Sequence, residues 1–359
     1  MKQVKMNGEE NASREGYSSF KRRKVLWIYS LAFVCVVVAF VSLCSGKYHM
    51  SLLEVLDAIF SSETSPSHTV VWDIRLPRII AAVLVGSALA IAGTVMQCSL
   101  RNPLASPYTL GISNAAALGA AVAIASSYLG WFSGTWFSDV LNSMYGMSLF
   151  AFLFSMATVV VVILLSRKSA TPETIVLAGV AIGSIFSAAL SSLLYFVDDT
   201  TLSQIVYWQF GDLSKATWSK LLILVAVLVP VVGYFIYHKI DYNSLEAGAD
   251  VAKSLGIDTR KLILRTMVLT SLIASVCVSM VGIIGFVGLL GPHIMRRIIG
   301  GDHRYLLIAS IVMGALVLLI ADAVGRIPFE STVPVGIITS FFGGPLFLYI
   351  LLIRRRHTE

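Results

Sequence analysis

Two histidines and an aspartate lie within one short polar stretch, and such side chains can bind metal ions. The stretch is GPHIMRRIIGGDHR (291–304), which contains His293, Asp302 and His303. Zinc sites that can be recognised from sequence repeat their ligands at short, regular spacings such as C-x-x-C. The spacing here fits no usual ligand set, so we expect no metal site and no cofactor. Capping of helix ends and support of a docking surface are the preferred interpretations of these residues.

Motifs for catalysis are missing as well. The sequence contains no HExxH, no GxSxG and no paired carboxylates, so an intramembrane enzyme would have no chemistry to use. It also lacks GxxxxGK[ST], so the chain does not hydrolyse ATP through a P-loop, and we predict that it is not an enzyme. The cysteines have no metal or redox spacing and are interpreted as small buried hydrophobic residues: Cys35, Cys44, Cys98 and Cys277.

The composition predicts the class of protein in which these residues lie. Hydrophobic residues make up 57% of the 359 residues and charged residues only 13%. Soluble domains carry roughly 25% charged residues, so this chain has too few to cover a water-facing surface. The apolar residues form long runs, and the alternation of an outer-membrane barrel is absent. We therefore predict an all-α integral membrane protein.

Apolar runs predict about ten transmembrane helices. They cover residues 25–45, 73–99, 108–129, 146–166, 172–197, 217–237, 263–284, 285–299, 304–324 and 333–353. The run at 285–299 is short and interrupted by glycine and proline, which indicates a broken or re-entrant helix. Small residues such as Gly86, Ala90 and Gly93 recur at helix-contact spacing and allow backbones to approach closely in lipid.

Basic residues predict the orientation. When the N-terminus and alternate loops are placed inside, all but six of the 27 lysines and arginines lie in inside segments. Positively charged loops stay on the cytoplasmic side, so both termini are expected in the cytoplasm. Residues 1–24 are polar and expected to be disordered, 25–353 form the membrane domain, and 354–359 form a short cytoplasmic tail.

Two segments outside the spans are amphipathic. Residues 199–212 carry Tyr207 and Trp208 and predict a short interfacial helix. Residues 238–262 form a polar cytoplasmic loop in which apolar residues recur at helical spacing, closed by a glycine stop signal. Such a helix either lies on lipid or on its own loops, or docks a soluble partner. Its residues are Leu245, Ala249, Ala252, Leu255 and Gly256.

Eight stretches, in order from residue 75 to 352, resemble the permease subunits of iron-siderophore and vitamin B12 ABC importers, often called the FecCD type. They are RLPRIIAAVLVGSALAIAGTVMQ (75–97), RNPLASPYTLGISNAAALGAA (101–121), LAGVAIG (177–183), YWQFGDL (207–213), AGADVAKSLG (247–256), GFVGLLGPHIMRRIIGGDHR (285–304), ADAVGR (321–326) and VPVGIITSFFGGPLFLYILL (333–352). The resemblance implies a type II ABC importer permease fold in a bacterial or archaeal inner membrane.

The resemblance also implies partners. Two ten-helix subunits, identical or different, would pair around a central pathway. Two ATPase subunits would dock on the cytoplasmic side at the 238–262 loop, and an extracytoplasmic binding protein would deliver the ligand. Nucleic acid is not among the expected partners, because the net charge of +7 comes from residues at the ends of membrane spans.

Further site residues come from the same resemblance. Arg75, Arg78 and Arg326, at the outer ends of spans, would grip carboxylates of the binding protein; the alternative is that they reach lipid headgroups. Asn102 to Leu104 (Asn102, Pro103, Leu104) and Thr171 would border the cytoplasmic gate. The alternative for RNPLASP (101–107) is a stiff structural turn.

The expected function is import of a ferric siderophore, with haem or cobalamin as alternatives. A stand-alone secondary transporter or channel and a membrane scaffold are the alternatives of another class. Proton-coupled transporters usually carry intramembrane carboxylates or histidines. Here Asp322 is the main such group, and it lies near the outer end of its span, which favours the ATP-driven importer.

Overall fold

The computed structural model describes residues 2–46, 48, 50–60, 65–131, 134–135, 139–140, 143, 145–168, 172–328 and 332–355. All regular structure among these residues is helical. The elements are α1 (Lys2–Cys44), α2 (Leu52–Phe60), α3 (Pro66–Thr69), the π-helix η1 (Val70–Arg75), α4 (Leu76–Ser99), η2 (Pro107–Leu110), α5 (Ile112–Tyr128), α7 (Gly146–Lys168), α8 (Pro172–Phe196), α9 (Asp199–Gln209), η3 (Leu213–Lys215), α10 (Trp218–Tyr237), α11 (Lys239–Ala247), α12 (Ala249–Ser254), α13 (Thr259–Val281), α14 (Val287–Ile299), α15 (His303–Arg326) and α16 (Val335–Arg355).

Each of the ten predicted spans contains a helix, which confirms the all-α membrane fold. Among the described residues, seven helices are long and apolar enough to cross a membrane, and α5 and α16 are shorter apolar helices. The tenth, α14, has only 13 residues. It follows an unwound segment at 282–286, in which Phe286 has a φ of 64°. The predicted interruption near residue 285 therefore lies before the helix.

The centre of the bundle is α4, which packs against α10, α13, α14 and α15. The most apolar part of the Pro66–Ser99 span is 83% buried, against 6% for the corresponding part of α1. Glycine allows this burial: a Cβ on Gly93 would overlap the carbonyl oxygen of Gly288, and one on Gly86 would overlap that of Gly314. The predicted close approach of backbones is confirmed at these two crossings.

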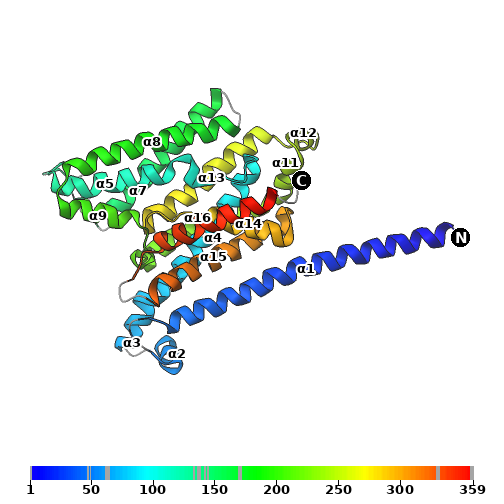
Figure 1. The fold of residues 1–359 in the computed structure, drawn as a ribbon, viewed down its shortest axis with the longest axis horizontal. Helices are drawn as coiled ribbons and strands as arrows, with labels where there is room; N and C mark the ends of the chain where they lie inside the picture. The colour runs from blue at the N-terminus through cyan, green and yellow to red at the C-terminus, as the bar shows by residue number, and fades with distance from the viewer. Residues whose placement is uncertain are drawn as a thin grey trace.

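The bundle has two distinct ends, shown in Figure 1. At one end lie α11, α12 and the C-terminus, and we call it the α11 end. At the opposite end lie α2 and α3, and we call it the α2 end. Helix α1 runs along α15, and its N-terminal half projects beyond the bundle at the α11 end (Figure 1). Both chain ends therefore lie on the same side of the bundle.

The sequence predicts disorder for residues 1–24, and this stays a prediction, although the structure shows residues 2–24 as helix. From Lys2 onward these residues continue α1 without a break. The stretch contains no proline, and adding residues to an existing helix avoids the unfavourable nucleation step. The apolar span that follows supplies that nucleus. The amphipathic segment 199–212 does form the predicted short helix, as α9, capped by the Asp198 side chain on the backbone N–H of Thr201.

Candidate translocation pathway and docking surfaces

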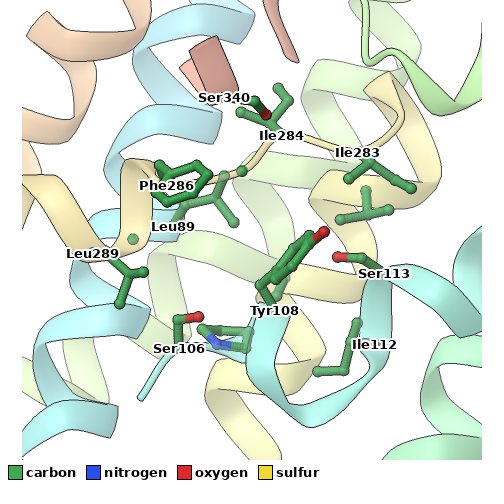
Figure 2. A pocket seen from close by; sticks show the side chains of 15 residues that line it. Leu89, Ser106, Tyr108, Ile112, Ser113, Ile283, Ile284, Phe286, Leu289 and Ser340 are labelled. Atoms are coloured by element: carbon green, nitrogen blue, oxygen red, sulfur yellow. The ribbon is translucent and has the colours of Figure 1, made fainter. Parts of the chain in front are cut away.

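A small apolar cavity lies beside the unwound segment 282–286. Its volume is about 100 Å³, and it is bounded by α4, η2, α5, α13, α14 and α16. Figure 2 shows Leu89, Tyr108, Ser113 and Phe286 around it. No acidic, basic or histidine side chain lines it among the described residues. An ion-coupled transporter would need such a group in its pathway, so the cavity offers no coupling site.

The three arginines predicted to dock a binding protein turn into their own subunit. Arg75 Nη1 donates to the carbonyl oxygen of Leu43 at 2.6 Å, and its Nη2 donates to that of Tyr48. Arg326 donates to the carbonyl oxygens of Ser42 and Ser45 at 2.7 and 2.5 Å. The carbonyls of Ser42, Leu43 and Ser45 lie at the end of α1, where helical partners are lacking, and that of Tyr48 follows in the next segment of the chain. Both guanidinium groups thus cap α1.

The third arginine, Arg78, binds Asp322, the main acidic group that the sequence places inside a span. Its Nε lies 2.8 Å from Oδ1 of Asp322, and Arg326 Nε lies 3.7 Å from Oδ2. The Asp322 side chain is 1% exposed, and the two arginine side chains are 9% and 10% exposed. The carboxylate is therefore the shared counter-charge of two buried cations. The role of the arginines in binding-protein docking stays a prediction.

Removing the Asp322 carboxylate should destabilise the subunit. In Asp322→Asn, Arg78 and Arg326 keep their charges in a buried site without a counter-charge. Breaking a buried pair in this way costs about 3–5 kcal/mol, so the thermal midpoint of the purified chain in detergent should fall clearly. Asp250→Asn is the control, because that side chain is 98% exposed. Equal midpoints for both variants would contradict the proposed charge balance.

The predicted gate turn lies at the α11 end, between α4 and η2. Arg101 has a φ of 47°, and the Asn102 side chain accepts a hydrogen bond from the backbone N–H of Leu104 at 2.9 Å. Pro103 is half-buried and Leu104 is 43% exposed. The turn is thus well defined and presents Leu104 outward. Thr171, assigned to the other gate segment, lies outside the described residues.

The predicted docking segment forms two short helices instead of one. Gly248, with a φ of 150°, separates α11 from α12. As a result the predicted apolar stripe does not form one face: Leu245 and Ala252 are buried within the subunit, whereas Leu255 is 65% exposed. Ala249 is half-buried and Gly256 is exposed. Leu255 and Gly256 therefore lie on the surface of the subunit and Leu245 and Ala252 in its interior, and the assignment of these residues to ATPase docking stays a prediction.

Burial of Tyr242 fixes α11 on the bundle. Its hydroxyl lies 2.8 Å from Oγ1 of Thr266 on α13, and burial raises the pKa of the phenol well above its usual value. Arg101 also reaches α11, donating to the carbonyl oxygen of Leu245 at 3.1 Å. The surface of α11 and α12 therefore rests on the core of the bundle and is held in one position.

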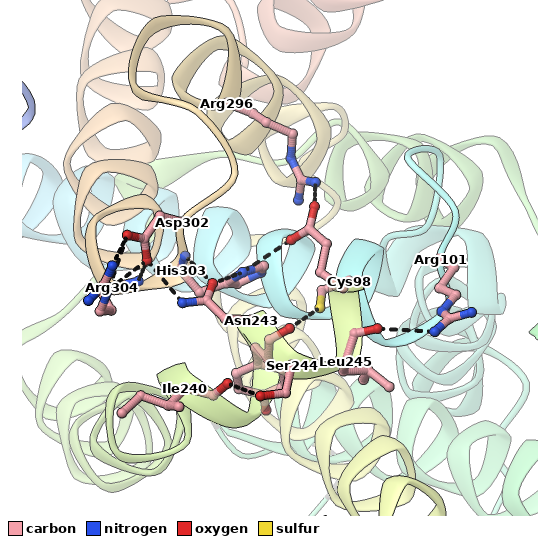
Figure 3. A network of polar contacts seen from close by, with 12 residues as sticks. Cys98, Arg101, Ile240, Asn243, Ser244, Leu245, Arg296, Asp302, His303 and Arg304 are labelled. Atoms are coloured by element: carbon pink, nitrogen blue, oxygen red, sulfur yellow. Dashed lines mark hydrogen bonds and ion pairs between the residues drawn. The ribbon is translucent and has the colours of Figure 1, made fainter. Parts of the chain in front are cut away.

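A polar network joins α11 to the start of α15 (Figure 3). Asp302 caps α15, accepting from the backbone N–H of Arg304 at 3.1 Å, and receives Nδ2 of Asn243 at 2.9 Å. Hydrogen bonds from the Arg304 side chain hold the pKa of Asp302 well below its usual range. Glu246 binds Arg296 and lies 3.2 Å from Nδ1 of His303. The preferred interpretation of Asp302 as a helix cap is confirmed.

Sequence reasoning missed several residues of these sites. Cys98, Asn243 and Glu246 meet His303 only because α4, α11 and α15 converge at the α11 end. No local motif marks them, since they come from distant parts of the chain. The lining of the cavity was also missed, although Phe286 lies in a stretch that the family resemblance includes. His293 stacks edge-on against Phe347 instead of joining His303.

A multi-pass helical chain with an uncharged inner cavity and a helical platform at one end has the features of a membrane permease. A family model described as the FecCD transport family matches residues 34–353. The chain belongs to the FecCD transport family. It is accordingly a permease subunit of an ABC importer in the inner membrane, a transport component and not an enzyme.

Several named relatives support this family assignment. The chain is 45% identical over 338 residues to an ABC transporter permease from Methanocaldococcus jannaschii, covering 94% of this chain and 97% of that one. It is 35% identical to the hemin transport system permease HmuU of Yersinia pestis, covering 89% and 95%. It is 34% identical to the vitamin B12 import system permease BtuC of Salmonella schwarzengrund, covering 92% and 96%.

A solved structure has the same fold. It is described as an inward-facing conformation of a metal-chelate type ABC transporter. The TM-score is 0.78 at 30% sequence identity, with 90% of this chain and 98% of that chain covered. The similarity therefore extends over almost the whole helix order described above.

Proposed function

We propose that this permease imports a ferric siderophore, with the α11 end in the cytoplasm and the α2 end outside. The observation that supports a metal-centred cargo most is the similarity over about nine-tenths of the chain to permeases named for hemin and vitamin B12 and to a metal-chelate transporter. Haem and cobalamin remain the alternative cargoes. The distribution of lysine and arginine supports the orientation.

The pathway would lie between two permease subunits. The cavity inside one subunit, about 100 Å³, has room for only a few water molecules, since each occupies about 30 Å³ in the liquid. No chelate of the proposed kind fits there. Two helices carry large exposed apolar side chains that a second subunit could cover, for example Leu177 and Ile185 on α8 and Phe341 and Phe342 on α16.

Partners would bind at the two ends. An ATPase subunit would contact α12 and the end of α11, where Val251 and Leu255 are exposed. The gate turn at Asn102, Pro103 and Leu104 lies at the same end. A binding protein would approach the α2 end, where Arg75 and Arg326 hold the end of α1 from within and Arg78 binds Asp322.

Transport should depend on ATP and on no ion gradient, because the main acidic group within the spans, Asp322, is already paired with Arg78 and Arg326 inside one subunit. The test is uptake of radiolabelled iron as a ferric siderophore into proteoliposomes that contain the permease and its ATPase, with the binding protein outside. We expect uptake only when ATP is enclosed in the proteoliposomes, on the side of the ATPase. An imposed proton or sodium gradient should not change the rate of uptake. Unlabelled haem or cobalamin should reduce the uptake of the labelled ferric siderophore only weakly.

Each other outcome identifies another function. Uptake driven by a pH gradient without ATP would identify a secondary transporter. Strong preference for haem or cobalamin over the siderophore would keep the importer and change the cargo. Complete absence of uptake, with a folded permease and an active ATPase, would leave the scaffold hypothesis.

A further inference from the structure

Three side chains of the metal-binding type meet at the α11 end of the bundle. They are Cys98 near the end of α4, Glu246 on α11 and His303 at the start of α15. One ligand atom from each lies within 4.8 Å of the other two. Figure 3 shows Cys98 and His303 converging on this point from different helices. The sequence does not predict this set, because its three residues lie far apart in the chain. In the sequence, His303 was grouped only with His293 and Asp302, which are near it.

The packing keeps two of the three side chains away from water. Cys98 is 3% exposed and His303 is fully buried. The Cys98 thiol donates a hydrogen bond, 3.3 Å long, to the carbonyl oxygen of Tyr242, and Nδ1 is the ring nitrogen of His303 that faces Glu246. When the thiol loses its proton, the sulfur becomes the form of cysteine that binds metal ions.

The distances suit a transition-metal ion. Nδ1 of His303 lies 3.2 Å from Oε2 of Glu246. Two nitrogen or oxygen ligands on a tetrahedral zinc ion, with bonds of about 2.0 Å, lie about 3.3 Å apart. For a thiolate and an imidazole the corresponding separation is about 3.5 Å, so closing the cluster needs side-chain movements of about 1 Å.

Neighbouring residues hold the three side chains in place. Arg296 binds Oε1 of Glu246 and leaves Oε2 on the side of His303. Oδ1 of Asn243 accepts the backbone N–H of His303 at 2.7 Å, and because it lies 3.1 Å from Nδ1 it offers a further oxygen beside the proposed ion. Such outer hydrogen bonds orient metal ligands in known sites. A thiolate and a carboxylate also cancel the charge of a divalent ion, so Arg296 does not repel it.

A route to the cluster and room for a further ligand are present. A cavity of about 570 Å³ is lined by Cys98 and Glu246 together with Gln97, Arg101 and Arg296. A water molecule in this cavity could complete a four-coordinate site with three protein ligands.

We propose that Cys98, Glu246 and His303 bind one divalent transition-metal ion of the Zn²⁺ or Co²⁺ type. Thiolate and imidazole ligands favour these ions over Mg²⁺ or Ca²⁺. The ion would tie α11 to α4 and α15 and so fix the platform assigned to the ATPase. Metal binding itself does not depend on the proposed cargo or partners, so failure of the uptake experiment would leave it untouched.

Cobalt absorption tests this site on the full chain, purified in detergent and treated with chelator. One equivalent of Co²⁺ should give a thiolate-to-cobalt charge-transfer band together with visible bands of a tetrahedral ion, and Zn²⁺ should displace it. Cys98→Ser should abolish the charge-transfer band. Cys277→Ser is the matched control, because Cys277 is also a buried free cysteine but lies outside this cluster, and it should leave the spectrum unchanged.

A second variant covers the case in which Cys98→Ser does not fold. Glu246→Gln keeps the shape of a side chain that is about one-third exposed, and it should weaken Co²⁺ binding at least tenfold through loss of the carboxylate ligand. Absence of a saturable cobalt spectrum in the unmodified chain would overturn the proposal. An unchanged affinity in Glu246→Gln, or an unchanged charge-transfer band in a folded Cys98→Ser, would overturn it equally.

Discussion

Gly93→Ala should abolish the folded permease or leave only a small fraction of it. The added Cβ would overlap the carbonyl oxygen of Gly288, a backbone atom that no side-chain rotation can move. Helix α14 would have to shift away from α4, the most deeply buried helix of the bundle. Overpacking in a core costs about 1–3 kcal/mol even when side chains can adjust, and here the backbone itself must move. We expect a loss of at least about 3 kcal/mol.

Gly233→Ala is the matched control for this prediction. Gly233 lies within α10, and nothing is within 4 Å of the position of an added Cβ. Alanine restricts the unfolded chain and favours helix, so this variant should be neutral or stabilised by up to about 1 kcal/mol. Size-exclusion chromatography in detergent and the thermal midpoint measure both variants. Similar midpoints for the two would mean that α4 and α14 do not approach as closely as described.

Most of the fold could be predicted from the sequence because lipid constrains it strongly. A helix satisfies its own backbone hydrogen bonds, and the thickness of the bilayer sets the length of an apolar run. The runs at 146–166 and 217–237 correspond to α7 and α10 for this reason. The crossings at Gly86 and Gly93 were predictable as well, because only small residues allow close helix contact in lipid.

The sites were less predictable because they depend on tertiary contacts. Arg75 and Arg326 lie at the ends of their spans, as predicted, but the sequence does not indicate that both turn inward to cap α1. Gly248 was read as part of a helix, whereas its φ of 150° ends α11 and separates Leu245 from the exposed surface. His303 was compared only with residues near it in sequence.

Leu255→Asp should remove ATPase binding and ATP-driven uptake while the permease still folds and inserts. Leu255 lies at the end of α12 with 65% of its surface exposed, and Val251, also exposed, is on the same helix. The core therefore does not depend on this side chain. If the two residues form the centre of the ATPase interface, loss of such an anchor costs at least about 2 kcal/mol, or roughly 30-fold in affinity. A buried unpaired carboxylate adds to that cost.

The measurement is the amount of ATPase subunit that co-purifies with the tagged permease, together with uptake in proteoliposomes. Leu53→Asp is the control: Leu53 is 78% exposed on α2, at the opposite end of the bundle, and should retain the ATPase fully. The two variants introduce the same charge at exposed leucines on short helices, so they differ mainly in position. Normal ATPase recovery with Leu255→Asp would contradict the docking assignment, and would mean that α12 lies on the lipid surface, as an amphipathic helix of this kind can do.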